Sequence, residues 1–302
     1  MLCEDHLLII YSFILYNASM NILKSFIYPC GLQRIILYNR LKKINYTLVR
    51  STSTINIKDV KHHSKLKDDW WGENSKIKIL HAFNPLRVQF IRDGLANIGF
   101  KEQTPNMSLQ GVKIVDVGCG GGILSEALAR IGAQVTGIDA SEELINIAKL
   151  HAELDSNISK NVNYVHSTIE EFSGENEKLY DVVVSSEVIE HVYNQKLFLR
   201  ECVRLLKPGG SIFITTPNKT LISWFFGIIV AEYVINIIPR GTHDWNNFIL
   251  PCEIQCILEK NGCKTKLIYG IVYNPIIKEW SLSSSTAFCY GLHAVKKKEI
   301  DV

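Results

Sequence analysis

The chain has 302 residues, of which 47% are apolar and 21% charged, the composition of an ordinary globular protein. This excludes a collagen or a coiled coil, and the length allows one well-buried domain with extensions or two small domains. The formal net charge of +3 does not indicate a nucleic-acid partner, and eight scattered cysteines without a Cys-x-x-Cys pair favour a reducing compartment.

The first 56 residues form a basic arm. No acidic residue occurs from His6 to Lys58, whereas lysine and arginine recur from Lys24 onward. A basic, hydroxyl-rich and acid-poor segment is typical of a mitochondrial presequence, with a disordered basic arm as the alternative. The apolar run 7–16 suits a presequence poorly, so an internal start at Met20 is a further hypothesis. We expect a targeting arm at 1–56 and a folded domain at 57–302.

After a predicted helix at 85–98, β-branched runs alternate with helical patterns. Strands are predicted at 113–117, 134–138, 162–166, 180–185 and 211–215, with helices at 123–131, 142–153 and 195–206. This alternation predicts a parallel sheet covered by helices on both faces. The last third predicts a helix at 248–262 and two strands, 264–273 and 286–295, with no helix between them. An antiparallel pair is therefore expected there.

A glycine-rich turn, Asp116-Val117-Gly118-Cys119-Gly120-Gly121-Gly122, follows the first predicted strand. Its glycines allow a tight turn and close approach of a ligand, and the next helix points free N–H groups at that ligand. Asp139 ends the second predicted strand, where a carboxylate can accept hydrogen bonds from ribose hydroxyls. The pattern predicts a nucleoside-bearing ligand.

S-adenosylmethionine and NAD are the two candidates for that ligand. A carboxylate at Asp116 would oppose a pyrophosphate but suits the cationic end of S-adenosylmethionine. The end of the fourth predicted strand, Ser185-Ser186-Glu187, is acidic, and the turn 206–210 is typical of methyltransferases. These features favour an α/β fold of the class I methyltransferase type. Such a fold is a Rossmann-like, mostly parallel sheet with helices on both faces and a C-terminal antiparallel hairpin.

From about Trp70 to the C-terminus, the chain resembles the ubiquinone biosynthesis O-methyltransferases. The matching segments are Trp70-Trp71, Asn84–Arg87, Val115–Ile123, Ala148–Ala152, Glu187–Val192, Thr216–Asn218, Ala231–Tyr233, Pro239–Asp244 and Tyr273–Pro275. The segments Asn84–Arg87 and Gly241–Asp244 are specific to this family, whereas the glycine motif is not. The run after Asp244 is less typical of the family, so no role is carried over beyond that residue.

The resemblance implies that Arg87, Gly118, Asp139 and Ser186 contact S-adenosylmethionine. It also implies methylation of ring hydroxyls on polyprenylated dihydroxybenzoate and demethylubiquinol in ubiquinone biosynthesis. The location implied is the matrix side of the inner mitochondrial membrane, as a peripheral subunit of a multi-subunit coenzyme Q biosynthetic complex. The basic arm indicates the same organelle by a separate argument.

Glu187, Glu190 and His191 have the spacing that places side chains on one face of a helical turn. Carboxylates there could hold Mg²⁺, and the histidine allows Zn²⁺ or Mn²⁺. A cation would favour the phenolate of a substrate hydroxyl, whose pKa is near ~10. The alternative is a metal-free pocket lining, although the resemblance favours the metal. His243 is a candidate general base by residue type, with a structural histidine as the alternative.

An apolar insertion is predicted at 219–245, rich in aromatic and β-branched residues. Lys219 and Arg240 flank its apolar stretch, in which Glu232 is the only charge. Basic ends and aromatic residues suit a helix that lies in a membrane interface, whereas an internal charge argues against crossing. A buried core helix is the alternative. We expect this insertion to contact the membrane from which a polyprenylated substrate is drawn.

A methyltransferase-like scaffold subunit without its own activity is the alternative function. A scaffold would not need Asp116, Gly118, Asp139 and Glu187 together. The sequence therefore favours the enzyme.

Overall fold

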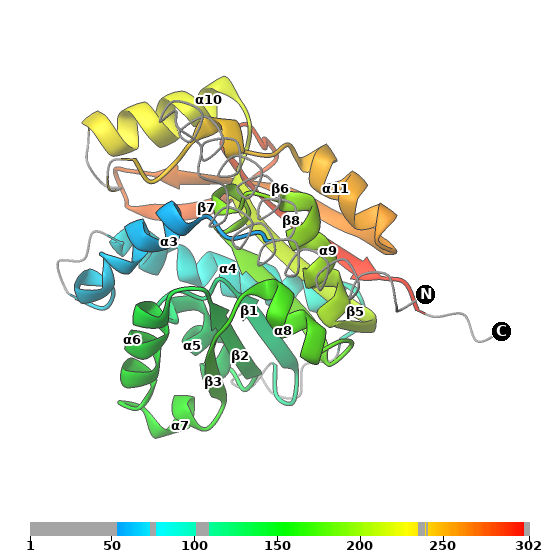
Figure 1. Cartoon of the computed structure of the whole chain (residues 1–302). Coiled ribbons are helices and arrows are strands. Elements are labelled where there is room, and N and C mark those ends of the chain that lie inside the picture. The colour runs from blue at the N-terminus through cyan, green and yellow to red at the C-terminus, as the bar shows by residue number, and fades with distance from the viewer. Residues whose placement is uncertain (1–52, 73–76, 101–108, 235–238, 240, 299–302) are drawn as a thin grey trace, which may run out of the picture. The chain divides into compact units, whose positions relative to one another are not determined.

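The computed structural model describes residues 53–72, 77–100, 109–234, 239 and 241–298 (Figure 1). All described residues lie in one compact unit, Thr52–Val302. The expected arm at 1–56 lies outside the described residues except for its last four. Those four belong to the folded unit, because Thr54 is buried and its carbonyl accepts a hydrogen bond from the N–H of Tyr193. The folded unit thus begins before the expected boundary.

Within the described residues, one sheet holds eight strands in the order β3-β2-β1-β4-β5-β8-β6-β7. Its parallel half consists of β1 (Lys113–Val117), β2 (Gln134–Asp139), β3 (Val162–His166), β4 (Tyr180–Ser186) and β5 (Leu206–Pro217). Its antiparallel part consists of β6 (Cys263–Asn274), β7 (Glu279–Ser283) and β8 (Cys289–Lys296). The predicted α/β fold, mostly parallel with antiparallel strands at the C-terminus, is confirmed.

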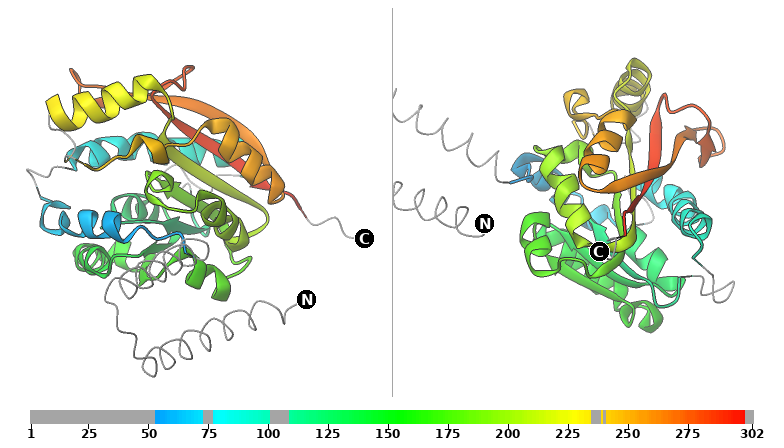
Figure 2. Two further views of the ribbon diagram at one scale, coloured as in Figure 1. Left: turned by 45° about the horizontal axis from the view of Figure 1, so that its top comes forward. Right: turned by 90° about the vertical axis from the view of Figure 1, so that its right-hand side faces the viewer.

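Helices cover both faces of this sheet (Figure 2). One face carries α4 (Lys78–Asn97), α5 (Ile123–Arg130) and α6 (Glu142–Ala152), and the other α8 (Ile169–Glu175), α9 (Gln195–Leu205) and α11 (Pro251–Lys260). Adjacent residues of β1 belong to hydrophobic clusters on opposite faces of the sheet. Ile114 is in the cluster that contains Leu128 of α5, and Val115 is in the cluster that contains Leu199 of α9. Alternation of this kind follows from the pleat of a strand that is buried on both faces.

Shorter elements lie between these helices and strands along the chain. They are α3 (Ile57–Ser64), η1 (Lys67–Asp69), α7 (Ser156–Ser159), η2 (Ile189–His191), α10 (Leu221–Ser223), η3 (Trp224–Val234) and η4 (Trp245–Asn247). The insertion between β5 and α11 contains three short helices: α10, the π-helix η3, and the 3₁₀ helix η4. No helix among the described residues has the length and apolar character needed to cross a membrane.

Three local expectations differ from the structure. The helix expected at 85–98 begins at Lys78, so Pro85 lies inside it rather than at its first turn, where proline is favoured. The segment 279–283 forms the edge strand β7, whereas the sequence predicted only two strands in this part of the chain. The expected turn at 206–210 is the irregular start of β5. Ser141 caps α6, since its side chain accepts the N–H of Leu144.

Candidate active site

A cavity of about 640 Å³ lies at the carboxyl ends of β1, β2 and β4. All four residues expected to contact the cofactor line it: Arg87, Gly118, Asp139 and Ser186. In the parallel half of the sheet, the strand order reverses between β1 and β4. Open α/β sheets bind ligands at that reversal, outside the carboxyl ends of the strands. The cavity therefore lies where the fold is expected to hold a nucleoside.

The glycine turn after β1 has the tight backbone that the sequence predicts. Gly118, Gly120 and Gly122 have φ values of 77°, 54° and 90°, in the left-handed region that favours glycine. The N–H groups of Gly118 and Cys119 both donate to the carbonyl of Ile138, at 2.8 and 3.0 Å. These bonds fix the turn to the end of β2, next to Asp139.

Two adjacent tryptophans support the turn. The indole of Trp70 lies so close to Gly120 and Gly121 that a Cβ on either would overlap it. The Nε1 of Trp71 donates to the carbonyl of Gly121 at 2.9 Å, and its ring stacks on His151 with centroids 3.5 Å apart. The sequence marked Trp70-Trp71 only as part of a family resemblance. In the structure both side chains contact the glycine turn and support its backbone.

Asp139 is oriented by backbone groups. Its Oδ2 accepts the N–H of Gly120 at 2.9 Å, and its Oδ1 accepts the N–H of Ser141 at 2.8 Å. Burial raises the pKa of this carboxyl, and the two backbone bonds oppose that rise. Each carboxylate oxygen has a second lone pair, so both can still accept a hydroxyl. The carboxylate is thus positioned for ribose hydroxyls before any ligand binds.

Asp116 lies beneath the same turn, fully enclosed by the protein. The Oγ of Ser125 donates to its Oδ2 at 2.6 Å. Burial raises the pKa of Asp116 to about 6, with the Ser125 bond and the charge of Arg87 opposing the rise. A buried carboxylate of this kind is stabilised by a neighbouring positive charge. A cationic ligand in the cavity would supply one.

The buried guanidinium of Arg87 contacts another predicted site residue. It donates to the Oγ of Ser186 at 3.2 Å, to the Oδ1 of Asn84 at 2.8 Å and to the carbonyl of Leu80 at 3.1 Å. Burial lowers its pKa to about 10, opposed by the charges of Asp116 and Glu187. Arg87 therefore stays charged at neutral pH and can attract a carboxylate.

The residues after β4 do not form the expected helical turn. Glu187 has a φ of 57°, and its N–H donates to the carbonyl of Thr215. Helical geometry begins only at the short 3₁₀ turn η2. Glu187, Glu190 and His191 therefore do not share one helix face, because a left-handed residue separates the first from the other two. The buried Oε1 of Glu187 has no hydrogen-bond partner among the described residues.

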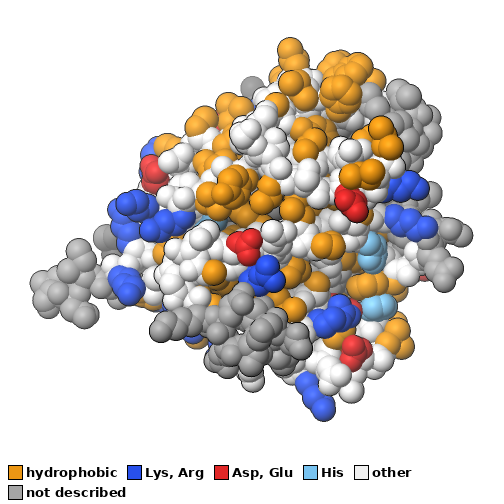
Figure 3. Space-filling model, turned by 180° about the vertical axis from the view of Figure 1, so that it is seen from behind, with side chains coloured by type: hydrophobic (Ala, Val, Ile, Leu, Met, Phe, Trp, Pro, Cys, Tyr) orange, Lys and Arg blue, Asp and Glu red, His pale blue; other side chains and the backbone are white. Residues whose placement is uncertain are grey.

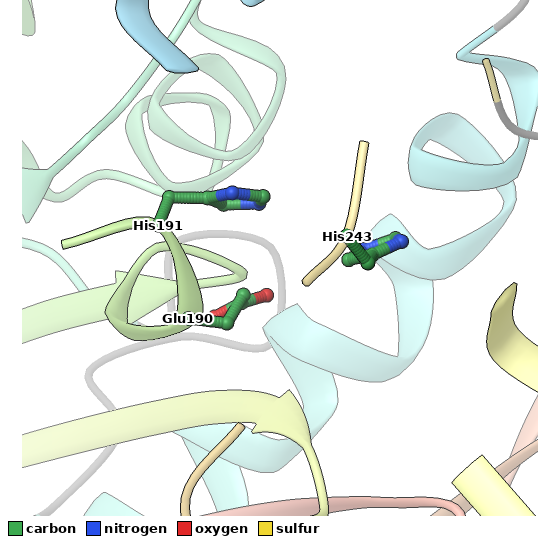
Figure 4. Close-up of side chains that lie close together, drawn as sticks. All are labelled: Glu190, His191 and His243. Carbon is green, nitrogen blue, oxygen red and sulfur yellow. The ribbon is translucent and has the colours of Figure 1, made fainter. Parts of the chain in front are cut away.

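Glu190 and His191 instead lie close to His243, which comes from the insertion (Figure 4). The nearest ligand atoms of the three residues are within 4.8 Å of one another. The Oε2 of Glu190 accepts from the Oγ1 of Thr216 at 2.9 Å, while its buried Oε1 has no partner in the part of the chain that is described. An unpaired buried carboxylate oxygen beside two imidazoles fits a divalent cation. The sequence had suggested His243 only as a base.

Helix α3 contacts this cluster from another side. The ring of His63 lies 4.8 Å from that of His191, centroid to centroid, and the Oδ2 of Asp59 lies 3.9 Å from His191 Nδ1. His62 reaches the Oγ1 of Thr242 at 3.3 Å. No role in the site was predicted for α3. The only local signal there is Asn56, whose side chain caps the first turn of the helix.

Known proteins of similar sequence and fold include methyltransferases. A family model described as a methyltransferase domain matches residues 115–214. The mitochondrial ubiquinone biosynthesis O-methyltransferase of Rattus norvegicus is 43% identical, over 83% of this chain and 72% of that protein. The ubiquinone biosynthesis O-methyltransferase of Pelagibacter ubique is 38% identical, over 81% of this chain and 99% of that protein. The crystal structure of a putative sarcosine dimethylglycine methyltransferase from Galdieria sulphuraria shares the fold, with a TM-score of 0.50 and 14% sequence identity. The match covers 71% of this chain and 87% of that one.

Proposed function

The chain belongs to the family of ubiquinone biosynthesis O-methyltransferases, and we propose that it methylates a ring hydroxyl of polyprenylated dihydroxybenzoate and of demethylubiquinol. The methyl donor is S-adenosylmethionine. One observation carries the proposal: a cavity lined by Gly118, Asp139 and Ser186 is also lined by His191 and His243. A nucleoside-binding turn and a candidate cation site thus line the same cavity.

The cofactor end of this cavity suits S-adenosylmethionine, which would supply the methyl group on its sulfonium. Asp139 presents oriented carboxylate oxygens for the ribose hydroxyls. Asp116 provides a buried negative charge for the cationic end, and Arg87 a positive charge for the carboxylate of the same end. In the reaction a substrate oxygen bonds to the methyl carbon as the sulfur–carbon bond breaks, which leaves S-adenosylhomocysteine, and the hydroxyl proton passes to water.

A divalent cation would be held by residues that follow β4. Glu187, Glu190 and His191 are the ligands proposed from the sequence, and Mg²⁺, Zn²⁺ or Mn²⁺ is the proposed ion. The unpartnered oxygens of both glutamates support this assignment. Such an ion would lower the pKa of a bound phenol and so raise the fraction of phenolate at neutral pH.

The apolar end of the cavity suits the polyprenyl tail. Phe226, Val272, Trp280 and Phe288 line it there. Hydrophobic side chains also gather on the outside at the end of the unit that carries α10 (Figure 3). On α10 and η3 the exposed hydrophobic residues are Leu221, Ile222, Trp224, Phe225 and Phe226. We propose that this surface rests on the membrane, so that a substrate drawn from the bilayer enters the cavity beside it.

Three further assignments rest on the sequence and the relatives. The mitochondrial names of relatives and the basic arm support a mitochondrial location. We place the protein on the matrix side of the inner membrane as a peripheral protein. We also propose that it is a subunit of a multi-subunit coenzyme Q biosynthetic complex.

A methyl-transfer assay tests the activity. The purified chain is given S-adenosylmethionine labelled in its methyl group and a short-tailed dihydroxybenzoate, with and without a chelator. Label should pass to the organic phase, and Asp139→Ala should abolish the transfer, whereas Asp155→Ala, at the cap of α7, should not. Binding of S-adenosylmethionine without any transfer would favour the scaffold alternative. If methyl transfer continued at the same rate after exhaustive chelation, the reaction would not require a cation.

A further inference from the structure

Glu232 is a buried charge in an apolar helix. It lies on η3, and its side chain is fully shielded from solvent. Its Oε2 accepts the N–H of Gly241 at 2.7 Å, and its Oε1 accepts the N–H of His243 at 3.0 Å. The same Oε1 lies 2.9 Å from the Nδ1 of His243. These hydrogen bonds fix one short loop, 241–243, and the histidine at its end.

These contacts decide which ring nitrogen of His243 is available. A carboxylate oxygen that already accepts a backbone N–H acts as an acceptor, so Nδ1 carries the proton that it shares with Glu232. The Nε2 atom then has a free lone pair. Histidines that bind metals commonly donate their other ring N–H to a carboxylate in this way, which fixes the tautomer and the ring orientation.

His191 has a similar environment. Its Nδ1 lies 3.9 Å from the carboxylate of Asp59 on α3, and its ring is roughly parallel to that of His243, with centroids 5.7 Å apart. In both His191 and His243, which come from distant parts of the chain, the Nδ1 atom is thus directed at a carboxylate. Glu190 contributes a buried Oε1 without a partner within the described residues.

The spacing of these atoms is close to what a bound ion requires. Ligand atoms that share an ion at ~2.1 Å are at most about 4.2 Å apart. The ligand atoms of Glu190, His191 and His243 lie within 4.8 Å of one another. Small side-chain rotations that move each atom by a few tenths of an ångström would bring them within the distance that a shared ion requires.

We propose that His243, held by Glu232, is a ligand of the same divalent cation as Glu190 and His191. The inference rests on the proposed function in that it deepens the assignment of its cation site. It adds a ligand from the membrane-facing insertion, which sequence spacing around Glu187 did not suggest. Two imidazoles and one carboxylate suit Mn²⁺ or Zn²⁺ better than Mg²⁺, which prefers oxygen ligands.

Counting the nitrogen ligands of bound Mn²⁺ tests this. Mn²⁺ is added to the purified full chain, its affinity is measured by calorimetry, and pulsed EPR counts the directly coordinated imidazole nitrogens. We expect two nitrogens in the unmodified chain and one in His243→Gln, with at least 10-fold weaker binding. Glu232→Gln should keep two nitrogens but bind Mn²⁺ about 10- to 100-fold more weakly, since it perturbs only the outer carboxylate. His166→Gln, an exposed histidine outside the cavity, should match the unmodified chain.

The nitrogen count in the unmodified chain is decisive even if a variant fails to fold. One nitrogen, or no bound Mn²⁺, overturns the proposal. Two nitrogens that persist in a folded His243→Gln variant overturn it as well. The two proposals also fail separately: methyl transfer together with one coordinated nitrogen, or none, leaves the activity and removes this ligand, whereas two nitrogens without methyl transfer leave the ligand and remove the activity.

Discussion

Gly118 lies directly against Val188. A Cβ on Gly118 would be 2.5 Å from the Cγ2 of Val188, and the backbone of Gly118 is left-handed, with a φ of 77°. Glycine is therefore required there both for its conformation and for the space it leaves. Because Val188 follows Glu187, this contact joins the cofactor turn after β1 to the acidic turn after β4.

Gly118→Ala should therefore disturb both turns. A left-handed alanine costs about 1–3 kcal/mol, and the methyl group must displace Val188. We expect a lower melting temperature and at least 10-fold weaker binding of S-adenosylmethionine, measured by calorimetry. Gly174→Ala is the matched control, since an added Cβ there has open space inside α8 and should leave the affinity unchanged. Equal affinities for the two variants would contradict the role of Gly118.

Arg87→Lys should weaken cofactor binding although it keeps the charge. One ammonium group cannot reach Ser186, Asn84 and Leu80 together, as the planar guanidinium does. The lost bonds should lower the free energy of unfolding by about 2–3 kcal/mol and the affinity for S-adenosylmethionine about 10-fold. Arg130→Lys, on the exposed end of α5, serves as the control and should change neither value. Unchanged denaturant midpoints and affinity in Arg87→Lys would show that the guanidinium fork is dispensable.

The sheet and the cofactor turn could be predicted because their signals are local. The strand at 113–117 contains the β-branched residues Ile114, Val115 and Val117, and the glycines that follow it favour a tight turn. Ser141 caps its helix through a bond to a residue three positions away. Patterns of this kind depend on neighbouring residues, so the sequence contains them in full.

The candidate cation site formed by Glu190, His191 and His243 could not be predicted in the same way. His191 meets His63 of α3 and His243 of the insertion, and both contacts join residues far apart in the chain. The spacing of Glu187, Glu190 and His191 suggested a helix face, but the left-handed φ of Glu187 removes that face. Glu232 was interpreted as a charge that argues against a membrane-crossing helix, and the structure shows in addition that it accepts hydrogen bonds from the loop 241–243. Tertiary contacts, rather than periodicity, decide such positions.

Replacing Leu221 and Phe225 together by serine should weaken membrane contact. Their side chains are 75% and 47% exposed and do not line the cavity, so the substrate site stays intact. Losing this apolar area should reduce binding to phosphatidylcholine–cardiolipin vesicles about 10-fold or more in a sedimentation assay. The matched control replaces Leu150 and Leu154, which are 63% and 81% exposed on another surface. If both double variants bound vesicles as the unmodified chain does, the insertion would not be the contact surface.

His293 should make the stability of the protein depend on pH between about 4 and 6.5. It lies on β8, stacked on Phe213 and bonded to the Oγ of Ser211, and burial lowers its pKa to about 4. Above pH 6.5 the histidine is neutral in both the folded and the unfolded chain. As the pH falls below 6.5, the unfolded chain takes up a proton that the folded chain resists, so stability declines until the pH reaches the folded pKa.

The full decline from this group is of the order of 3 kcal/mol, because each unit of pKa difference corresponds to about 1.4 kcal/mol. Urea unfolding at pH 7, 6, 5 and 4.5 measures it. His293→Gln cannot titrate, so its stability should be lower at pH 7, where the stacking is lost, and should fall less steeply with acid than that of the unmodified chain. His166→Gln should keep the original slope, since His166 is exposed. Identical slopes in the unmodified chain and His293→Gln would mean that other groups, such as the carboxyls, account for the acid sensitivity.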